Sequence, residues 1–143
     1  MADGLLHQEY EVAAGDYESA GEASADIKRR LRQLGISSQV LRRVAVASYE
    51  VELNLVIHSL GGRLTLDVDA AGVRLQSADI GPGIPDVDLA MREGYSTASE
   101  EARALGFGAG MGLPNMKRNA DDFSIESTVG VGTTIFMFFA LAA

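Results

Sequence analysis

The sequence predicts an α+β fold, a two-layer α/β sandwich in which one mixed, mostly antiparallel sheet is covered by helices on one face. Two patterns predict it: apolar residues recur at helical spacing in two early segments, and apolar and polar residues alternate in segments around them. The size agrees, because 143 residues with 47% hydrophobic content suit one core. We therefore expect residues 1–143 to form a single domain.

The first half of the chain predicts one strand and two helices. Residues 7–13 alternate loosely and predict an opening strand. Residues 16–34 place apolar side chains every three or four positions, which predicts an amphipathic helix ended by a glycine. Ser37 or Ser38 can cap a second helix, which we expect to run to about His58.

The second half predicts a sheet with a long polar insertion. Residues 63–69 and 73–79 alternate and are joined by a short turn, which predicts two antiparallel strands. Residues 86–105 are polar with a short helical stretch near their start, so we expect a loop that acts as a lid. A helix and a final hairpin are expected over residues 116–120, 123–127 and 133–141.

Composition excludes several classes of function. A net charge of −8 and a pI near 4.6 argue against a broad surface for nucleic acid or anionic membrane. The lack of cysteine excludes disulfides, zinc-thiolate sites and thiol nucleophiles. The N-terminus lacks the pattern of a signal peptide, and no stretch approaches the ~20 apolar residues of a membrane helix. We therefore expect a cytoplasmic protein that binds another protein or a compact ligand.

Polar residues gather on one face of the second predicted helix. Glu50 and Asn54 are four positions apart, so their side chains share a face, and His58 continues that line. Taken alone, Glu50 and Asn54 are more typical of a solvated helix face than of a site. His58 alone is more typical of a helix end than of a ligand.

A carboxylate and two glycines mark the turn after the second hairpin strand. Asp79 ends that strand, and its carboxylate can accept a hydrogen bond from an exocyclic amine such as that of adenine. Gly81 and Gly83 let backbone and ligand approach without a side-chain collision. An ordinary acidic turn explains the same residues about equally well.

A glycine cluster at residues 106–112 runs directly into a predicted helix. Free backbone N–H groups and the helix dipole at such a start attract phosphate. The cluster is not a P-loop, because no Lys-Ser/Thr pair follows it. Alternating glycines also form flexible linkers, so this cluster alone is a weak signal.

Four motifs in the chain resemble, in order, the nucleotide-binding boxes of the GHKL ATPases and kinases, which share the Bergerat or HATPase fold. They are Glu50-x-x-x-Asn54, Asp79-x-Gly81-x-Gly83, Gly108-x-Gly110-x-Gly112-Leu113 and Gly132-Thr133-Thr134. Within that superfamily the chain is similar to the small bacterial serine-kinase and anti-sigma-factor group. The similarity runs over residues 45–134, whereas the first forty residues match only in expected shape.

The resemblance implies a site for ATP and Mg²⁺. Asn54 would coordinate Mg²⁺, and Glu50 would act as the catalytic general base on a partner's hydroxyl or on water. Asp79 would take the adenine amine, assisted by Thr134. The other implied nucleotide contacts shape the base pocket or cradle the phosphates, and they are Gly81, Gly83, Ile84, Gly108, Ala109, Gly110, Met111, Gly112 and Leu113.

The resemblance implies an ATP-dependent protein serine/threonine kinase that phosphorylates a STAS-domain protein in a partner-switching pathway. The alternative is an anti-sigma factor that holds a sigma factor, or another downstream regulatory protein, in a nucleotide-dependent way. A detached ATP-binding domain of a histidine kinase ranks third, because no helix pair with a phosphoacceptor histidine precedes the predicted site. Both a monomer and a homodimer remain open.

Overall fold

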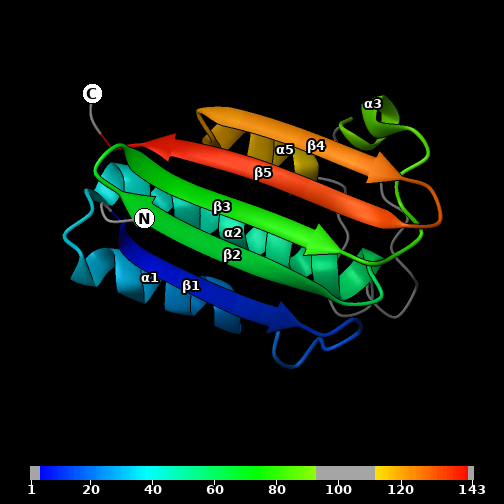
Figure 1. Ribbon diagram of the computed structural model, residues 1–143, viewed down its shortest axis with the longest axis horizontal. Helices are drawn as coiled ribbons and strands as arrows, with labels where there is room; N and C mark the ends of the chain where they lie inside the picture. The colour runs from blue at the N-terminus through cyan, green and yellow to red at the C-terminus, as the bar shows by residue number, and fades with distance from the viewer. Residues whose placement is uncertain (1–3, 93–111, 142–143) are drawn as a thin grey trace.

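The computed structural model describes residues 4–92 and 112–141, and Figure 1 shows the course of the chain. The elements, in chain order, are β1 (Gly4–Val12), α1 (Glu22–Gln33), α2 (Ser38–His58), β2 (Gly62–Asp69), β3 (Gly72–Asp79), α3 (Val87–Ala90), α5 (Gly112–Asn119), β4 (Asp122–Thr128) and β5 (Gly132–Ala140).

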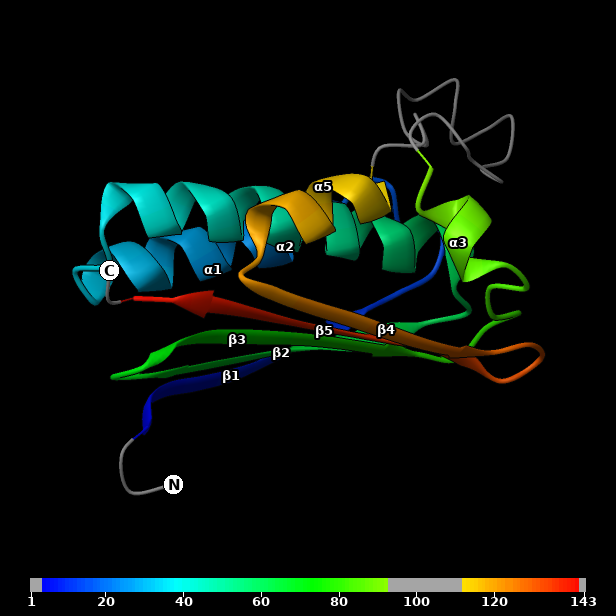
Figure 2. The ribbon, with the colours of Figure 1, turned by 90° about the horizontal axis from the view of Figure 1, so that it is seen from above.

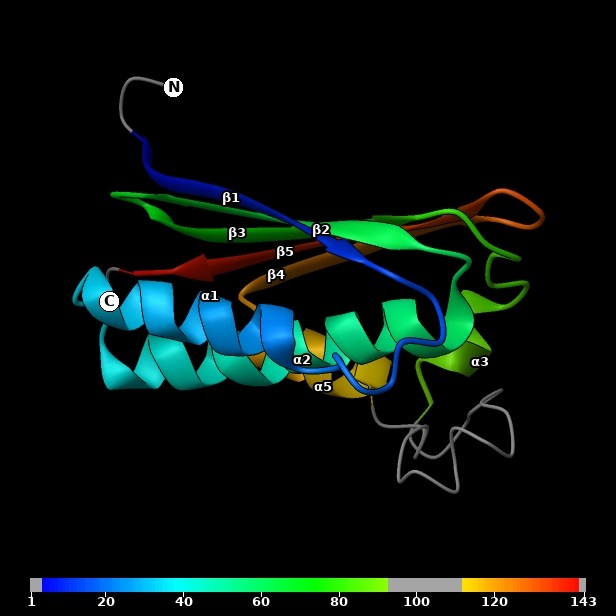
Figure 3. The ribbon, with the colours of Figure 1, turned by 90° about the horizontal axis from the view of Figure 1, so that it is seen from below.

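The strands form one sheet in the order β1-β2-β3-β5-β4. All four pairings between these strands are antiparallel, so the described sheet is antiparallel throughout rather than mixed. Helices α1, α2 and α5 lie on the same face of the sheet (Figures 2 and 3). The predicted two-layer α+β class, with helices on one face, is confirmed.

The core lies between the sheet and these helices. Alternate residues of the strands point toward the helices, and the other set lines the helix-free face, as the alternation predicted. The fully buried side chains include Leu64, Leu66, Leu75, Ile135, Met137 and Phe139 from the sheet and Ile27, Leu31, Val44, Val51, Leu55 and Met116 from the helices. Within the described part of the chain, no helix is long and apolar enough to cross a membrane.

Helix α2 is the longest helix described and begins where the sequence predicted. The Ser37 hydroxyl accepts a hydrogen bond from the Val40 amide at 3.4 Å and so caps the first turn. The helix ends at His58, because Ser59 is extended and Gly61 has a φ of 126°. One side of α2 packs on the sheet, and α1 and α5 flank it. Helix α2 therefore contacts α1, α5 and the sheet, which together carry the residues described below.

Helix α1 begins at Glu22, not at residue 16 as predicted. Gly21 has a φ of 101° and no side chain of its own to cap the helix. The cap comes from Glu52 of α2, which is only 2% exposed. Its carboxylate accepts hydrogen bonds from three backbone amides at 2.9–3.2 Å, those of Gly21, Ala23 and Ser24. A contact between two helices thus sets the start of α1.

Candidate functional site

The turn formed by residues 79–85 is held from two sides. Toward the end of α2, Ile80 exchanges backbone hydrogen bonds with Leu60 and Gly61, at 2.7 and 3.1 Å. Toward the β4–β5 hairpin there are three further bonds, from Gly81 N to Val131 O, from Gly130 N to Pro82 O and from Ile84 N to Ser127 Oγ. The turn is therefore a fixed part of the fold.

The packing of the chain itself requires glycine at position 83 and favours it at position 81. Gly83 has a φ of 76°, and a Cβ there would lie 2.5 Å from the backbone oxygen of Thr128. A Cβ on Gly81 would lie 3.3 Å from Ser59 Cα and 3.5 Å from Asp79 Oδ1. These glycines let the turn lie against the β4–β5 hairpin and the end of α2. Their contact with a ligand stays a prediction.

Asp79 points toward the helical side of the sheet and is partly buried. Its Oδ1 accepts a hydrogen bond from the Thr133 amide at 3.0 Å. Burial raises the pKa of the Asp79 carboxyl above its ordinary value, although the Thr133 amide acts in the opposite direction. Among the described residues no other side chain or amide donates to this carboxylate, so it keeps capacity to accept from a ligand.

The structure brings Thr133, rather than the predicted Thr134, to Asp79. Along β5 the buried positions include Thr133, Ile135 and Met137, so Thr134 points to the helix-free face. The Thr133 hydroxyl shares a hydrogen bond with Ser127 at 2.8 Å, and Ser127 in turn accepts from Ile84 N. The motif Gly-Thr-Thr contained the right pair of residues, but the pleat of the strand selects its first threonine.

Glu50 lies where α2 meets the start of α5. Its Oε2 accepts a hydrogen bond from Asn115 Nδ2 at 2.8 Å. A Cβ built on Gly112, the first residue of α5, would lie 3.9 Å from Glu50 Oε1. Asn54 is one helical turn farther along the same face and is also partly buried. The sequence did not predict Asn115, because only the packing of the two helices shows this contact.

The two predicted acidic residues lie toward different parts of α2. A Cβ built on Gly81 would have both Asp79 Oδ1 and His58 O as neighbours. Asp79 therefore lies near the C-terminal end of the helix. Glu50 is a little over two turns before that end, about 12 Å along the axis. Burial lowers the pKa of His58. Asp79, Asn54 and Glu50 therefore follow one another along α2, as an extended ligand would require.

Magnesium would fit Asn54 only with help from a bound ligand. Among residues 4–92 and 112–141 there is no group of three or more acidic or histidine side chains that could hold a metal ion. Mg²⁺ is commonly bound through one or two protein oxygens together with the phosphates of a substrate. The amide oxygen of Asn54 suits that kind of site.

Several predicted contacts lie outside the described residues. These are Gly108, Ala109, Gly110 and Met111, together with residues 93–105 of the predicted lid. Of the remaining predicted residues, Leu113 is 7% exposed and belongs to the core. Gly112 begins α5 beside Glu50, and Ile84 is fastened through its backbone to Ser127.

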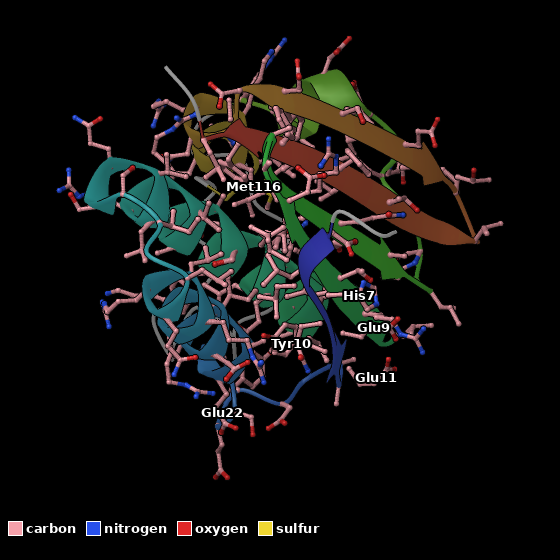
Figure 4. The ribbon with its side chains drawn as sticks, turned by 60° about the vertical axis from the view of Figure 1, so that its left-hand side comes forward. His7, Glu9, Tyr10, Glu11, Glu22 and Met116 are labelled. Carbon is pink, nitrogen blue, oxygen red and sulfur yellow. The ribbon has the colours of Figure 1, made fainter. Side chains whose placement is uncertain are left out.

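A cavity of about 400 Å³ lies elsewhere, between β1, α1 and α2. Figure 4 labels Tyr10 and Glu22, two of the residues that line it. Six acidic residues line it, Glu9, Glu11, Asp16, Glu22, Asp26 and Glu52, although the carboxylates of Glu9 and Glu11 pair with Arg63 on the helix-free face of the sheet. This charge repels phosphate, so the cavity is unsuited to a nucleotide.

Comparisons with known proteins identify the family of the chain. The family of histidine kinase-, DNA gyrase B-, and HSP90-like ATPases matches residues 40–143. Serine/threonine-protein kinase RsbT of Bacillus subtilis is 32% identical over 108 residues, which cover 73% of this chain and 75% of that protein. The anti-sigma F factor of Thermoanaerobacter sp. is 31% identical over 110 residues, 73% of each chain. The anti-sigma F factor of Caldanaerobacter subterraneus is 30% identical over 110 residues, which again cover 73% of each chain.

Proposed function

Because the chain belongs to the histidine kinase-, DNA gyrase B-, and HSP90-like ATPase family, we propose that it transfers phosphate from ATP to a serine or threonine of a partner protein. Membership of this family means that the chain binds ATP. Within the family its relatives are the kinase RsbT and the anti-sigma F factors, so it belongs to the bacterial partner-switching group.

The placement of Glu50 carries the proposal. Its carboxylate lies beside Gly112 at the start of α5, where an anionic phosphate chain is favoured by the helix dipole and free amides. Glu50 is bound to Asn115 through one oxygen, and Oε1 lies toward Gly112. A serine or threonine hydroxyl at that oxygen would lose its proton to Glu50 as it attacks the terminal phosphate, and the bond between that phosphate and the departing ADP would break.

The remaining roles are proposed from the same arrangement. Asp79 would accept from the adenine amine at the far end of α2, with Thr133 fixing its carboxylate. Asn54 would hold Mg²⁺, which when bound neutralises charge on the phosphates. Phosphoryl transfer depends mainly on positioning and charge neutralisation, which supports a site made of one base, one metal ligand and the predicted backbone donors.

The substrate that we propose is a STAS-domain protein, which is the partner class implied by the resemblance to the serine-kinase group. A second candidate function is favoured by the relatives named anti-sigma F factor, namely nucleotide-dependent binding of a sigma factor. Both functions use one nucleotide site, so only the partner distinguishes them.

The test is incubation of the chain with γ-labelled ATP, Mg²⁺ and candidate STAS-domain and sigma partners. We expect label on a serine or threonine of a STAS-domain protein and no transfer when EDTA removes the metal. A stable sigma complex without labelled STAS protein would support the second candidate. Acid-labile label on a histidine would instead indicate the histidine-kinase class. Failure to bind both ATP and ADP would contradict the nucleotide site itself.

A further inference from the structure

Asn115 of α5 is the only described residue that donates a hydrogen bond to the Glu50 carboxylate. Because a carboxylate accepts and does not donate, the amide nitrogen of Asn115 must face Glu50. The other end of the amide is fixed independently, since Arg118 Nη1 donates to Asn115 Oδ1 at 2.9 Å. The orientation of the Asn115 side chain is therefore set from both ends.

Helix α5 delivers this amide from a firmly placed element. Leu113 and Met116, on either side of Asn115, are buried in the core. At the end of the helix, Arg43 Nε of α2 donates to Asn119 O at 2.8 Å, and Arg43 also pairs with Asp121 at 3.0 Å. The spacing between Asn115 and Glu50 is thus maintained by contacts at both ends of α5.

We propose that Asn115 is a positioning residue that holds the Glu50 carboxylate in the orientation needed to take a proton from the phosphoacceptor. The inference rests on the proposed function. The hydrogen bond from Asn115 occupies Oε2, and Oε1 lies 3.9 Å from a Cβ built on Gly112. Oε2 fixes the Glu50 side chain, and Oε1 accepts the proton.

The anchor matters because a glutamate side chain has several rotatable bonds, and Glu50 is only partly buried. Without Asn115 the carboxylate would sample several rotamers, and few of them would direct an oxygen at the attacking hydroxyl. A misplacement of about 1 Å in a catalytic group can cost on the order of 100-fold in rate. Nucleotide affinity should be unchanged, because Asn115 contacts the general base Glu50 and not the part of the site that we propose for adenine.

The consequence is a selective loss in the chemical step. We expect Asn115→Ala to lower the single-turnover phosphotransfer rate by about 10- to 100-fold while ATP and ADP affinities change less than about two-fold. Asn115→Asp, which has nearly the same size, should be at least as slow because it places a second carboxylate against Glu50. Lys117→Ala, at an exposed position of the same helix, is the matched control and should keep the wild-type rate.

The decisive experiment is a double-mutant cycle with Glu50→Gln, read out by phosphotransfer rate, nucleotide affinity and the urea midpoint of unfolding. If Asn115 acts through Glu50, Asn115→Ala causes no further loss of rate in the Glu50→Gln chain. Should Asn115→Ala fail to fold, Asn115→Asp takes its place in the same cycle.

Three results would overturn the inference while leaving the proposed function intact: a wild-type rate in Asn115→Ala and Asn115→Asp, a parallel loss of nucleotide affinity, or a further loss of rate beside Glu50→Gln. A wild-type chain that binds ATP but labels no partner would overturn the proposed function and this inference with it. Because that result appears in the wild type, the two failures are distinguishable.

Discussion

Glu50 and Glu52 stand two positions apart on α2 but have opposite environments. Glu52 is 2% exposed, and its carboxylate accepts from three backbone amides at the start of α1. Glu50 is partly buried and accepts from one described side chain, that of Asn115. A carboxylate surrounded by donors stabilises the fold, whereas one with unused acceptor capacity is available for chemistry.

The same difference separates two aspartates in the two regions. Asp26 of α1 accepts from Tyr10, Arg30 and Arg29, and hydrogen bonds led by that of Tyr10 lower its pKa to about 2. Asp79 accepts from the Thr133 amide, and burial raises its pKa. In the β1–α1 region the carboxylate of Asp26 is stabilised by several donors of the protein. In the candidate site the carboxylate of Asp79 has few donors, so a ligand can supply the missing hydrogen bonds.

The largest expected effect is a loss of phosphotransfer rate when Glu50, but not Glu52, is replaced. Glu50→Gln should lower the phosphotransfer rate by about 10²- to 10⁴-fold, the usual contribution of a general base. The urea midpoint and the nucleotide affinity should stay close to wild type, because Asn115 can still donate to the glutamine oxygen. Stopped-flow or quenched transfer assays, together with a nucleotide titration, measure both. Equal losses of rate and affinity would mean that Glu50 is structural.

The second effect is on stability at Glu52. Glu52→Ala leaves three backbone donors at the start of α1 without their acceptor, and each buried unsatisfied group costs about 1–3 kcal/mol. We expect a loss of about 3 kcal/mol or more in the free energy of unfolding, measured in urea. Glu52→Gln retains one acceptor oxygen and should lose about half as much. A change below about 1 kcal/mol for the alanine variant would show that Glu52 is not the cap of α1.

Local patterns in the sequence predicted most of the fold but not its contacts between elements. The alternation of residues 63–69 and 73–79 and the serine cap of α2 are local signals, and both appear in the structure. The start of α1 was predicted wrongly, because its cap, Glu52, is 31 positions from Gly21. The spacing in sequence could not show which of two nearby glutamates turns toward α1.

The site shows the same limit at finer scale. The pairing of Glu50 with Asn54 and the turn at Asp79 follow from sequence motifs, and the structure places all three along α2. The choice between Thr133 and Thr134 depends on the pleat of β5, where a shift of one residue reverses the face. Asn115 could not be predicted, because its partner belongs to a different helix.

The third effect joins affinity and stability at Asp79. Asp79→Asn exchanges an acceptor for an amide, and we expect at least about 100-fold weaker nucleotide binding because the adenine amine loses its partner. The same change should raise the free energy of unfolding slightly at pH 7, and solvent screening limits the gain because the carboxyl is partly exposed. The pKa of Asp79 is raised in the folded state, so ionising the carboxylate as pH rises costs stability that asparagine does not lose.

Two measurements test this prediction. Fluorescent-nucleotide titration gives the affinity, and urea unfolding at several pH values gives the stability. The advantage of the asparagine variant should disappear below about pH 3.8, where the aspartate is protonated in both states. Unchanged nucleotide affinity would remove Asp79 from the site, and a loss of stability at pH 7 would place it with Asp26 as a stabilising carboxylate.

The smallest effect concerns Asp26, whose carboxylate should stabilise the fold only while it is ionised. Its folded pKa of about 2 lies below the ordinary value of 3.8, so its contribution is present above about pH 3.8 and is lost as pH falls toward 2. A shift of this size corresponds to about 2 kcal/mol, and solvent screening around the exposed Arg29 should reduce it to about 1 kcal/mol. Asp26→Asn should therefore lower the free energy of unfolding at pH 7 by about 1 kcal/mol. The difference from wild type should disappear between pH 4 and pH 2. The control Asp122→Asn, at an exposed position of β4, should change the free energy of unfolding little. A difference that persists undiminished at pH 2 would show that Asp26 contributes by packing and not by charge, and the contrast with Asp79 would then rest on burial alone.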